Sequence, residues 1–225
     1  MQKADTTSAI TNMTMQRDSR RKIFEGIYRH RKWGKEGGGS GPGSDLRFAR
    51  GASDIVSKVI SLLAIHSMID APCGAREWQT PMVHELQTKD PEFRYLGLDI
   101  ASKAIEQNRD PKLPTQLHDL VGDPMPLGYD MVLSRDALQH NTEADIFKIL
   151  KRFACSDARF FLLGSYPQSK DFNKKIRTGD YFEVDLQKEP YSLKPWMIFN
   201  EHHGGKHLYL YNTSQVAHFA KSCTD

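Results

Sequence analysis

Residues 67–79 read SMIDAPCGAREWQ, and the rest of the chain is organised around this stretch. Its apolar start is typical of a buried strand, and a helix-compatible segment follows from Glu77. A strand, a tight turn and a helix form the first nucleotide-binding turn of an open α/β sheet. Gly74 can adopt a positive φ and admit a ligand close to the backbone, because it has no Cβ. The pattern also fits an ordinary strand-to-helix turn, and the missing G-x-G-x-x-G spacing argues against a dinucleotide site.

The length and composition of the chain limit the number of domains and the compartment that we expect. With 225 residues, 39% of them hydrophobic, the chain can form one globular domain with a modest extension. No apolar run is long enough to cross a bilayer, and the N-terminus lacks the apolar core of a secretory signal. Three cysteines, odd in number and far apart, predict neither a disulfide framework nor a zinc site. A cytoplasmic, reducing compartment is the simplest expectation, and a luminal compartment is the alternative if the sequence is part of a longer chain.

Charge is distributed unevenly along the chain. The first fifty residues hold 11 Lys and Arg against 5 Asp and Glu, whereas the remainder is slightly acidic. A basic arm can bind nucleic acid, phosphates or acidic surfaces, but it is more often the solvated face of a helix. Nucleic acid is therefore the less favoured partner.

The N-terminal third reads as helices around a glycine-rich segment. Residues 1–15 are polar and aperiodic, which predicts a disordered tail. Apolar residues between positions 18 and 33 lie on one helical face, and residues 46–64 form a second amphipathic helix. Between them stands GKEGGGSGPGS, residues 34–44, which we expect to hold no regular element. This segment is either a flexible linker or a mobile lid over a ligand within an N-terminal region spanning residues 16–66.

Strand and helix patterns then alternate. Further strands are expected at 93–100, 115–121, 129–134 and 159–165, with helices at 77–87, at 102–109 and after Thr142, which forms a capping box with Asp145. A long loop, 167–194, precedes two strands, 196–202 and 207–212, joined through Gly204-Gly205. The sequence therefore predicts a Rossmann-like α/β fold. Its seven-stranded sheet is mostly parallel with an antiparallel C-terminal hairpin, and helices cover both faces.

Four motifs occur in a recognisable order, namely DAPCGAREW, LGLDI, HDL and DMVLSRDALQH. Together they resemble the class I S-adenosylmethionine-dependent methyltransferases, with a core at residues 67–225. More narrowly, the chain is similar to a group of small, mostly uncharacterised bacterial-type members. That group combines a Trp-Gly-rich N-terminal segment (Trp33-Gly34 with GGGSGPGS), an SRD motif (residues 134–136) and a late FNE (residues 199–201). The resemblance implies S-adenosylmethionine as the cofactor.

The family's cofactor contacts fall on defined positions of this chain. Asp99, at the end of the second strand, matches the acid that accepts hydrogen bonds from the ribose hydroxyls, and a carboxylate suits a vicinal diol. Asp119, or the backbone of its neighbours, matches the adenine edge. The implied cofactor site comprises Trp33, Asp70, Ala71, Cys73, Gly74, Trp78, Asp99, Ile100, His118, Asp119, Leu120 and Ser134.

The candidate catalytic residues follow the fourth strand. Arg135, Asp136 and His140 lie beside the expected methyl group, and Asp136 and His140 share a face if this turn is helical. Transfer to a hydroxyl requires a proton acceptor, for which a histidine near neutrality is well suited. Alternatively, His140 only caps a helix or packs in the core.

Other residues fall where this fold shapes its acceptor pocket. We expect Arg177, Asp180, Tyr181, Glu201 and His202 to contact the substrate. His202, His203 and His207 suggest a metal, but no carboxylate or cysteine completes a known spacing, so no metal site is predicted.

The sequence thus predicts an O-methyltransferase that acts on a hydroxyl of a small polar or sugar (glycan) acceptor. One alternative is a methyltransferase that docks nucleic acid or protein through the basic N-terminal arm. Another is a non-catalytic binding module with a methyltransferase-like fold, because fold does not determine function. The acceptor's identity and the oligomeric state stay open.

Overall fold

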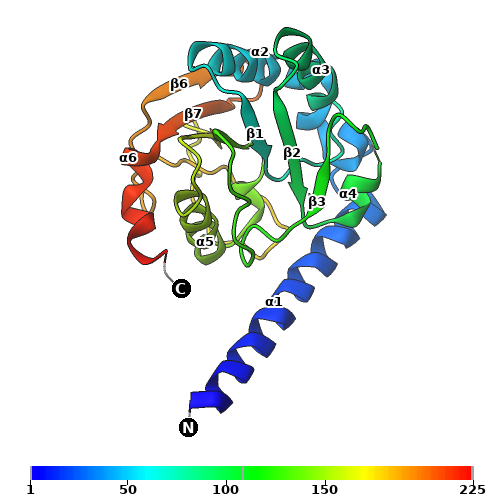
Figure 1. The fold of residues 1–225 in the computed structure, drawn as a ribbon. Helices are drawn as coiled ribbons and strands as arrows, with labels where there is room; N and C mark the ends of the chain where they lie inside the picture. The colour runs from blue at the N-terminus through cyan, green and yellow to red at the C-terminus, as the bar shows by residue number, and fades with distance from the viewer. Residues whose placement is uncertain (1, 108, 224–225) are drawn as a thin grey trace.

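A seven-stranded sheet forms the centre of the molecule in the computed structural model, which describes residues 2–107 and 109–223 (Figure 1). The strand order is β3-β2-β1-β4-β5-β7-β6. Neighbouring strands are parallel from β3 to β5, whereas β7 runs antiparallel to both β5 and β6. The strands are β1 Ser67–Asp70, β2 Arg94–Asp99, β3 Thr115–Leu117, β4 Met131–Ser134, β5 Phe160–Ser165, β6 Met197–Asn200 and β7 His207–Asn212. The predicted sheet is confirmed.

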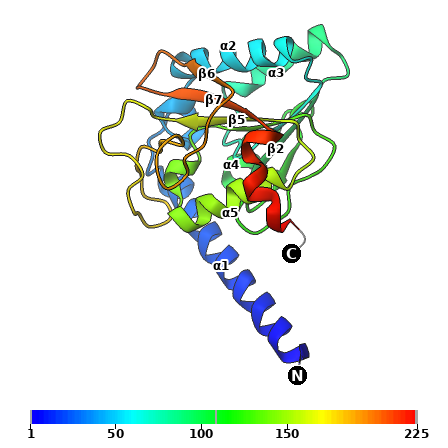
Figure 2. The same cartoon turned by 90° about the vertical axis from the view of Figure 1, so that its left-hand side faces the viewer.

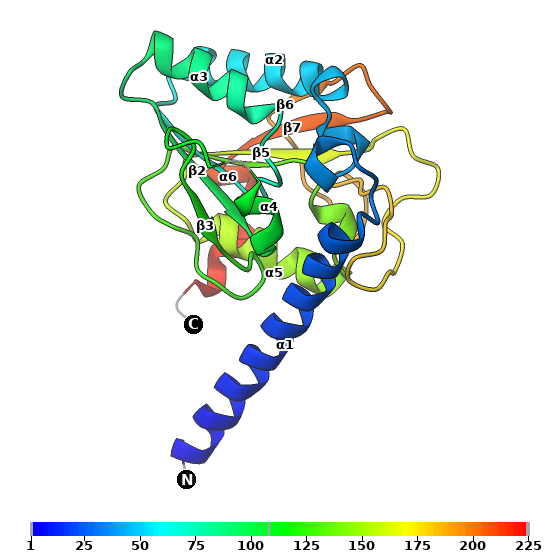
Figure 3. The same cartoon turned by 90° about the vertical axis from the view of Figure 1, so that its right-hand side faces the viewer.

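Helices cover both faces of this sheet. Helices α2 and α3 lie on one face, and α5 and α6 lie on the other (Figures 2 and 3). The α-helices are α1 Gln2–His30, α2 Leu46–Leu62, α3 Gln79–Lys89, α4 Ser102–Glu106, α5 Glu143–Ala154 and α6 Thr213–Val216. Short 3₁₀ helices are η1 Gly37–Gly39, η2 Pro42–Ser44, η3 Leu138–His140 and η4 Ala217–Ser222. The helix α5 begins where the capping pattern placed it, because the Thr142 hydroxyl accepts a hydrogen bond from the Asp145 amide.

The core has two layers because successive residues of a strand point to opposite faces of the sheet. Met68 and Leu210 pack with α2 and α3, whereas Ile69 and Tyr211 pack with α5. All four are fully buried, and burial of such a side chain contributes about 1.5–3 kcal/mol. The parallel strands β1, β2 and β4 place their carboxyl ends at one edge of the sheet, where the candidate site lies.

The N-terminal helix is longer than the sequence predicted. Instead of a disordered tail at 1–15 and a helix from position 18, α1 begins at Gln2 and continues to His30. Its first turns project away from the domain (Figures 1 and 3), which explains why they carry no apolar stripe. The second half packs on the domain, where Arg20 and Ile27 are buried.

The glycine-rich segment also differs from expectation. We expected no regular element in residues 34–44, but the segment forms η1 and η2. Gly38 and Gly41 have φ values of 61° and 92°, in the region that favours glycine. The Ser40 hydroxyl accepts a hydrogen bond from the Ala75 amide (3.1 Å), so the segment lies directly over the first turn. Its mobility stays a prediction.

The cysteine prediction was wrong. Cys155, after α5, and Cys223, after η4, form a disulfide with a Cα–Cα distance of 5.5 Å. The two residues are 68 positions apart in sequence, and only the packing of the C-terminal helices on α5 brings them together. The cysteine count therefore gives no argument for a reducing compartment. Among the described residues, no helix is long and apolar enough to cross a membrane.

Candidate functional site

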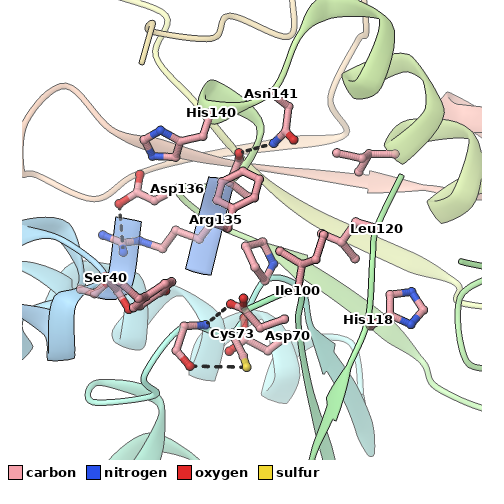
Figure 4. A pocket seen from close by; sticks show the side chains of 18 of the residues that line it. Ser40, Asp70, Cys73, Ile100, His118, Leu120, Arg135, Asp136, His140 and Asn141 are labelled. Carbon is pink, nitrogen blue, oxygen red and sulfur yellow. Dashed lines mark hydrogen bonds and ion pairs between the residues drawn. The ribbon is translucent and has the colours of Figure 1, made fainter. Parts of the chain in front are cut away.

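A pocket of about 850 Å³, counting its open mouth, lies at the carboxyl ends of β1, β2 and β4. Helix α1 and the glycine-rich segment form its outer wall. Figure 4 shows Asp70 and Cys73 at one end of the pocket and Asp136 and His140 at the other. The residues predicted from sequence that line it are Trp33, Asp70, Cys73, Gly74, Trp78, Asp99, Ile100, His118, Asp119, Leu120, Arg135, Asp136 and His140.

Asp99 connects the ends of β1 and β2. Its carboxylate accepts hydrogen bonds from the Gly74 amide (3.0 Å) and from the Ala101 amide (2.9 Å). Each carboxylate oxygen has a second lone pair, so Asp99 can also accept two neighbouring hydroxyl groups from a ligand. Burial raises the pKa of Asp99 to about 6. Gly74 has a φ of 57°, which confirms the backbone conformation expected for the turn.

Asp70 is a second buried carboxyl group at this end of the pocket. The Tyr95 hydroxyl and the Gln79 amide nitrogen each donate to the same carboxylate oxygen, both at 2.8 Å. Burial raises the pKa of Asp70 to about 7. Two buried carboxyl groups at one end favour a ligand that brings positive charge. Burial also raises the pKa of the Cys73 thiol well above its usual range, so Cys73 stays a neutral thiol.

Helix α1 contributes one wall of the pocket. Arg20 Nη2 lies 2.5 Å from Asp119 Oδ2, and Arg20 Nε lies 3.2 Å from the same oxygen. Both side chains are almost fully buried. Phe24 and Tyr28, one and two turns further along α1, also line the pocket. Asp119 therefore reaches the pocket already paired, and α1 is part of the site.

The His140 side chain is held by one hydrogen bond and one stacking contact. Its Nδ1 lies 2.9 Å from the backbone oxygen of Asp180, and because a carbonyl only accepts, Nδ1 carries the hydrogen. Nε2 therefore keeps its lone pair. Burial lowers the pKa of His140, which favours the neutral ring. Trp33 stacks on the imidazole with a centroid distance of 4.3 Å and holds its plane.

Asp136 has a different character. Its φ of 52° interrupts the chain before η3, so Asp136 and His140 do not share a helical face as expected. Burial alone would raise the pKa of Asp136, but Arg135 and Lys206, together with a hydrogen bond from the Tyr166 hydroxyl (2.8 Å), hold it well below its usual range. A carboxylate held in this way is a weak base.

Arg135 holds together three parts of the site. Its Nε and Nη2 donate to the two carboxylate oxygens of Glu201 at 3.0 and 2.7 Å, in a fully buried pair. Its Nη1 donates to the backbone oxygen of Gly43 in the glycine-rich segment at 2.9 Å. Arg135 therefore joins the end of β4 to the β6–β7 turn and to the roof of the pocket. Glu201 supports Arg135 and does not line the pocket.

The remaining predicted residues lie outside the pocket. Ala71 and Ser134 are buried, and Arg177 and His202 are exposed. Asp180 acts through its backbone oxygen, and the Tyr181 ring lies 5.7 Å from the His140 ring. Within the described ranges, no three His, Cys, Asp or Glu side chains are grouped to hold a metal ion.

Sequence reasoning missed part of the site. The pocket also includes Arg20, Phe24, Tyr28, Ser40, Ser44, Gln79 and Asn141, and Tyr166 and Lys206 hold Asp136. The apolar stripe of α1 signalled Phe24 and Tyr28 as buried, but not what they face. For Arg20 and Gln79 the sequence carries no signal, because their partners are set by tertiary packing.

The fold is shared with solved methyltransferase structures. The structure of human N-acetylserotonin methyltransferase with SAM matches with a TM-score of 0.55 and 14% identity, over 84% of this chain and 58% of that chain. The structure of PigF with SAH matches with a TM-score of 0.57 and 12% identity, over 84% of this chain and 62% of that chain. Magnesium protoporphyrin IX methyltransferase from Synechocystis PCC 6803 with SAH matches with a TM-score of 0.52 and 12% identity, over 73% of this chain and 84% of that chain.

This chain spans less than two thirds of the length of the first two proteins. At these identities the likeness shows a common fold. No family model matches the sequence. No curated protein matches it either.

Proposed function

We propose that this chain binds S-adenosylmethionine and transfers its methyl group to a hydroxyl oxygen of a small polar or sugar acceptor. The observation that carries the proposal is that His140, with an unprotonated Nε2, and Asp99, with free acceptor capacity, line one pocket. The shared fold of methyltransferases solved with SAM or SAH supports the cofactor. The Trp-Gly segment and the SRD motif of the narrower bacterial-type group support the same assignment.

The cofactor would lie across the ends of β1, β2 and β3. Asp99 would accept the ribose hydroxyls, and Asp119 would receive the adenine amino group. The Gly74 turn would face the methionine part, whose positive charges suit the buried carboxyl groups there. His118 and Leu120 would flank the adenine, and Trp33 would help to exclude water.

His140 is the residue that we assign as the general base. The cofactor's sulfonium supplies an activated methyl group, so the protein has to align the acceptor and remove one proton. His140 Nε2 would take the proton that the acceptor hydroxyl loses when it is methylated. The ionised Asp136 would stabilise the resulting imidazolium, since its charge opposes the lowering of the pKa of His140 by burial. The Asp180 carbonyl keeps the ring in the required tautomer.

The walls near His140 suit an acceptor with a flat apolar face. Trp33 contacts the rings of Tyr28 and Phe24 edge-on, with centroid distances of 6.0 and 6.2 Å. An aromatic wall beside a base and a carboxylate fits a sugar ring or a small phenol. A nucleic-acid acceptor is less favoured, because Arg17 and Arg20 of the basic α1 are already paired with Asp123 and Asp119.

A tritiated-methyl transfer screen across sugars, small phenols, RNA and peptides tests this proposal. With the acceptor found, His140→Gln should lower turnover by roughly 10²- to 10⁴-fold while S-adenosylhomocysteine affinity changes little. His218→Gln is the matched control, because His218 is exposed on η4 outside the pocket. Normal turnover of His140→Gln would show that the base lies elsewhere. Cofactor binding without transfer to any acceptor class would favour a non-catalytic binding module.

A further inference from the structure

Gln79, at the start of α3, is a buried side chain that lines the pocket and has an unsatisfied acceptor. It is 4% exposed. Its Nε2 donates to Asp70 Oδ2 at 2.8 Å and to the backbone oxygen of Cys73 at 3.0 Å. An amide nitrogen carries two hydrogens, so both are used.

These two bonds fix the orientation of the amide. The opposite orientation would place Oε1 against a carboxylate oxygen and a carbonyl oxygen, which are both acceptors. In the orientation that satisfies Nε2, Oε1 is buried and has no hydrogen-bond partner among the described residues. An unpaired buried carbonyl destabilises the protein unless a donor reaches it. Its place on the pocket wall indicates that a ligand supplies this donor.

We propose that Gln79 Oε1 accepts a hydrogen bond from the α-ammonium group of the cofactor's methionine part. This inference rests on the proposed function. The hydrogen-bond donors of S-adenosylmethionine are its ribose hydroxyls, its adenine amino group and its ammonium group. Asp99 and Asp119 are placed for the first two, at the ends of β2 and β3. The ammonium group is the donor that remains for the wall beside β1, where Gln79 adjoins the Asp70 carboxyl group and the Gly74 turn.

The test separates the ammonium contact from a structural role of Gln79. Calorimetry should compare S-adenosylhomocysteine with its deaminated analogue, in which hydrogen replaces the α-amino group. Both ligands are titrated into the wild type, Gln79→Met and Gln87→Met. Gln87 is the matched control, because it lies on the same helix and also has a buried, unpartnered Oε1, but it does not line the pocket.

The proposal predicts that Gln79→Met weakens S-adenosylhomocysteine binding by about 10- to 100-fold, as for a bond to a charged donor, and barely changes binding of the analogue. Gln87→Met should bind both ligands as the wild type does. Equal weakening of both ligands by Gln79→Met would overturn the proposal, because Gln79 would then only hold Asp70 in place. If neither ligand binds the wild type, the proposed function itself fails.

A second measurement needs no substitution. In the wild-type protein, the side-chain amide signal of ¹⁵N-labelled Gln79 should shift when S-adenosylhomocysteine binds and stay near its free position with the analogue. The same shift with both ligands would contradict the ammonium contact.

Discussion

The pairing of Arg20 with Asp119 allows a direct test of whether α1 forms a wall of the pocket. Arg20→Met keeps most of the side-chain length but removes the guanidinium group, whose Nη2 and Nε both contact Asp119 Oδ2. Asp119 would keep one hydrogen bond, from the Val121 amide at 3.1 Å. Its side chain is only 2% exposed, so water cannot replace the lost partner without movement of α1.

The burial of Asp119 sets the expected loss in the free energy of unfolding of Arg20→Met. Removing one partner of a buried ion pair destabilises a protein by about 3–5 kcal/mol, because the remaining charge is left uncompensated. The matched control is Arg21→Met on the next residue of α1. Arg21 is 43% exposed and contacts Glu25 at 3.8 Å, so its loss should change the free energy of unfolding by only about 0–1 kcal/mol.

Urea unfolding of both variants at pH 7 measures the difference, and limited proteolysis within the second half of α1 shows whether the helix detaches locally. S-adenosylhomocysteine affinity should also fall in Arg20→Met, because Phe24 and Tyr28 leave the pocket with the helix. If Arg20→Met matches Arg21→Met in unfolding free energy, in cleavage and in ligand affinity, α1 is not a wall of the site.

Three further predictions concern other parts of the pocket. The folded-state pKa of Asp70 (about 7) lies above its ordinary value, so the folded state binds the proton more tightly and stability falls as pH rises from about 4 to 7. Asp70→Asn cannot ionise at this position and should remove this loss, which is about 4 kcal/mol in the free energy of unfolding. Urea unfolding between about pH 4 and 7 measures it. If the free energy of unfolding of Asp70→Asn falls with pH as steeply as that of the wild type, the prediction is contradicted. Gly179, with a φ of 90°, donates its amide to the His140 carbonyl, and an added Cβ would lie 2.7 Å from Ile23 Cγ2. Gly179→Ala should therefore lower turnover by roughly tenfold through His140, and it should lower S-adenosylhomocysteine affinity by less, because Ile23 belongs to the α1 wall; equal losses in both would point to general unfolding. Residues 34–44 should resist limited proteolysis better with saturating cofactor and acceptor than without, because ordering a glycine-rich segment over a ligand restricts its backbone; equal cleavage would count against a lid.

The sequence was sufficient for the fold because the sheet is built from short apolar runs separated by turn residues. Each expected strand is present, with ends shifted by a few residues. The same logic located Asp99 and His140, since the carboxyl ends of parallel strands meet at one edge.

What the sequence could not show depends on tertiary packing. Arg20 and Asp119 are 99 residues apart, and no local pattern connects them. The positive φ of Asp136 replaces an expected helical turn, and Lys206 and Tyr166, which hold its carboxylate, are distant from it in sequence. The pairing of Cys155 with Cys223 likewise follows from the docking of η4 on α5.

The most direct test of the central claim is calorimetric titration of S-adenosylhomocysteine into the wild type and Asp99→Ala. The ligand should bind the wild type without added metal, and Asp99→Ala should weaken binding by about 1.5–3 kcal/mol, as expected for lost hydrogen bonds to a charged group. NAD should give no heat of binding. Tight binding of NAD with none of S-adenosylhomocysteine, or equal affinity of both proteins for S-adenosylhomocysteine, would contradict the account.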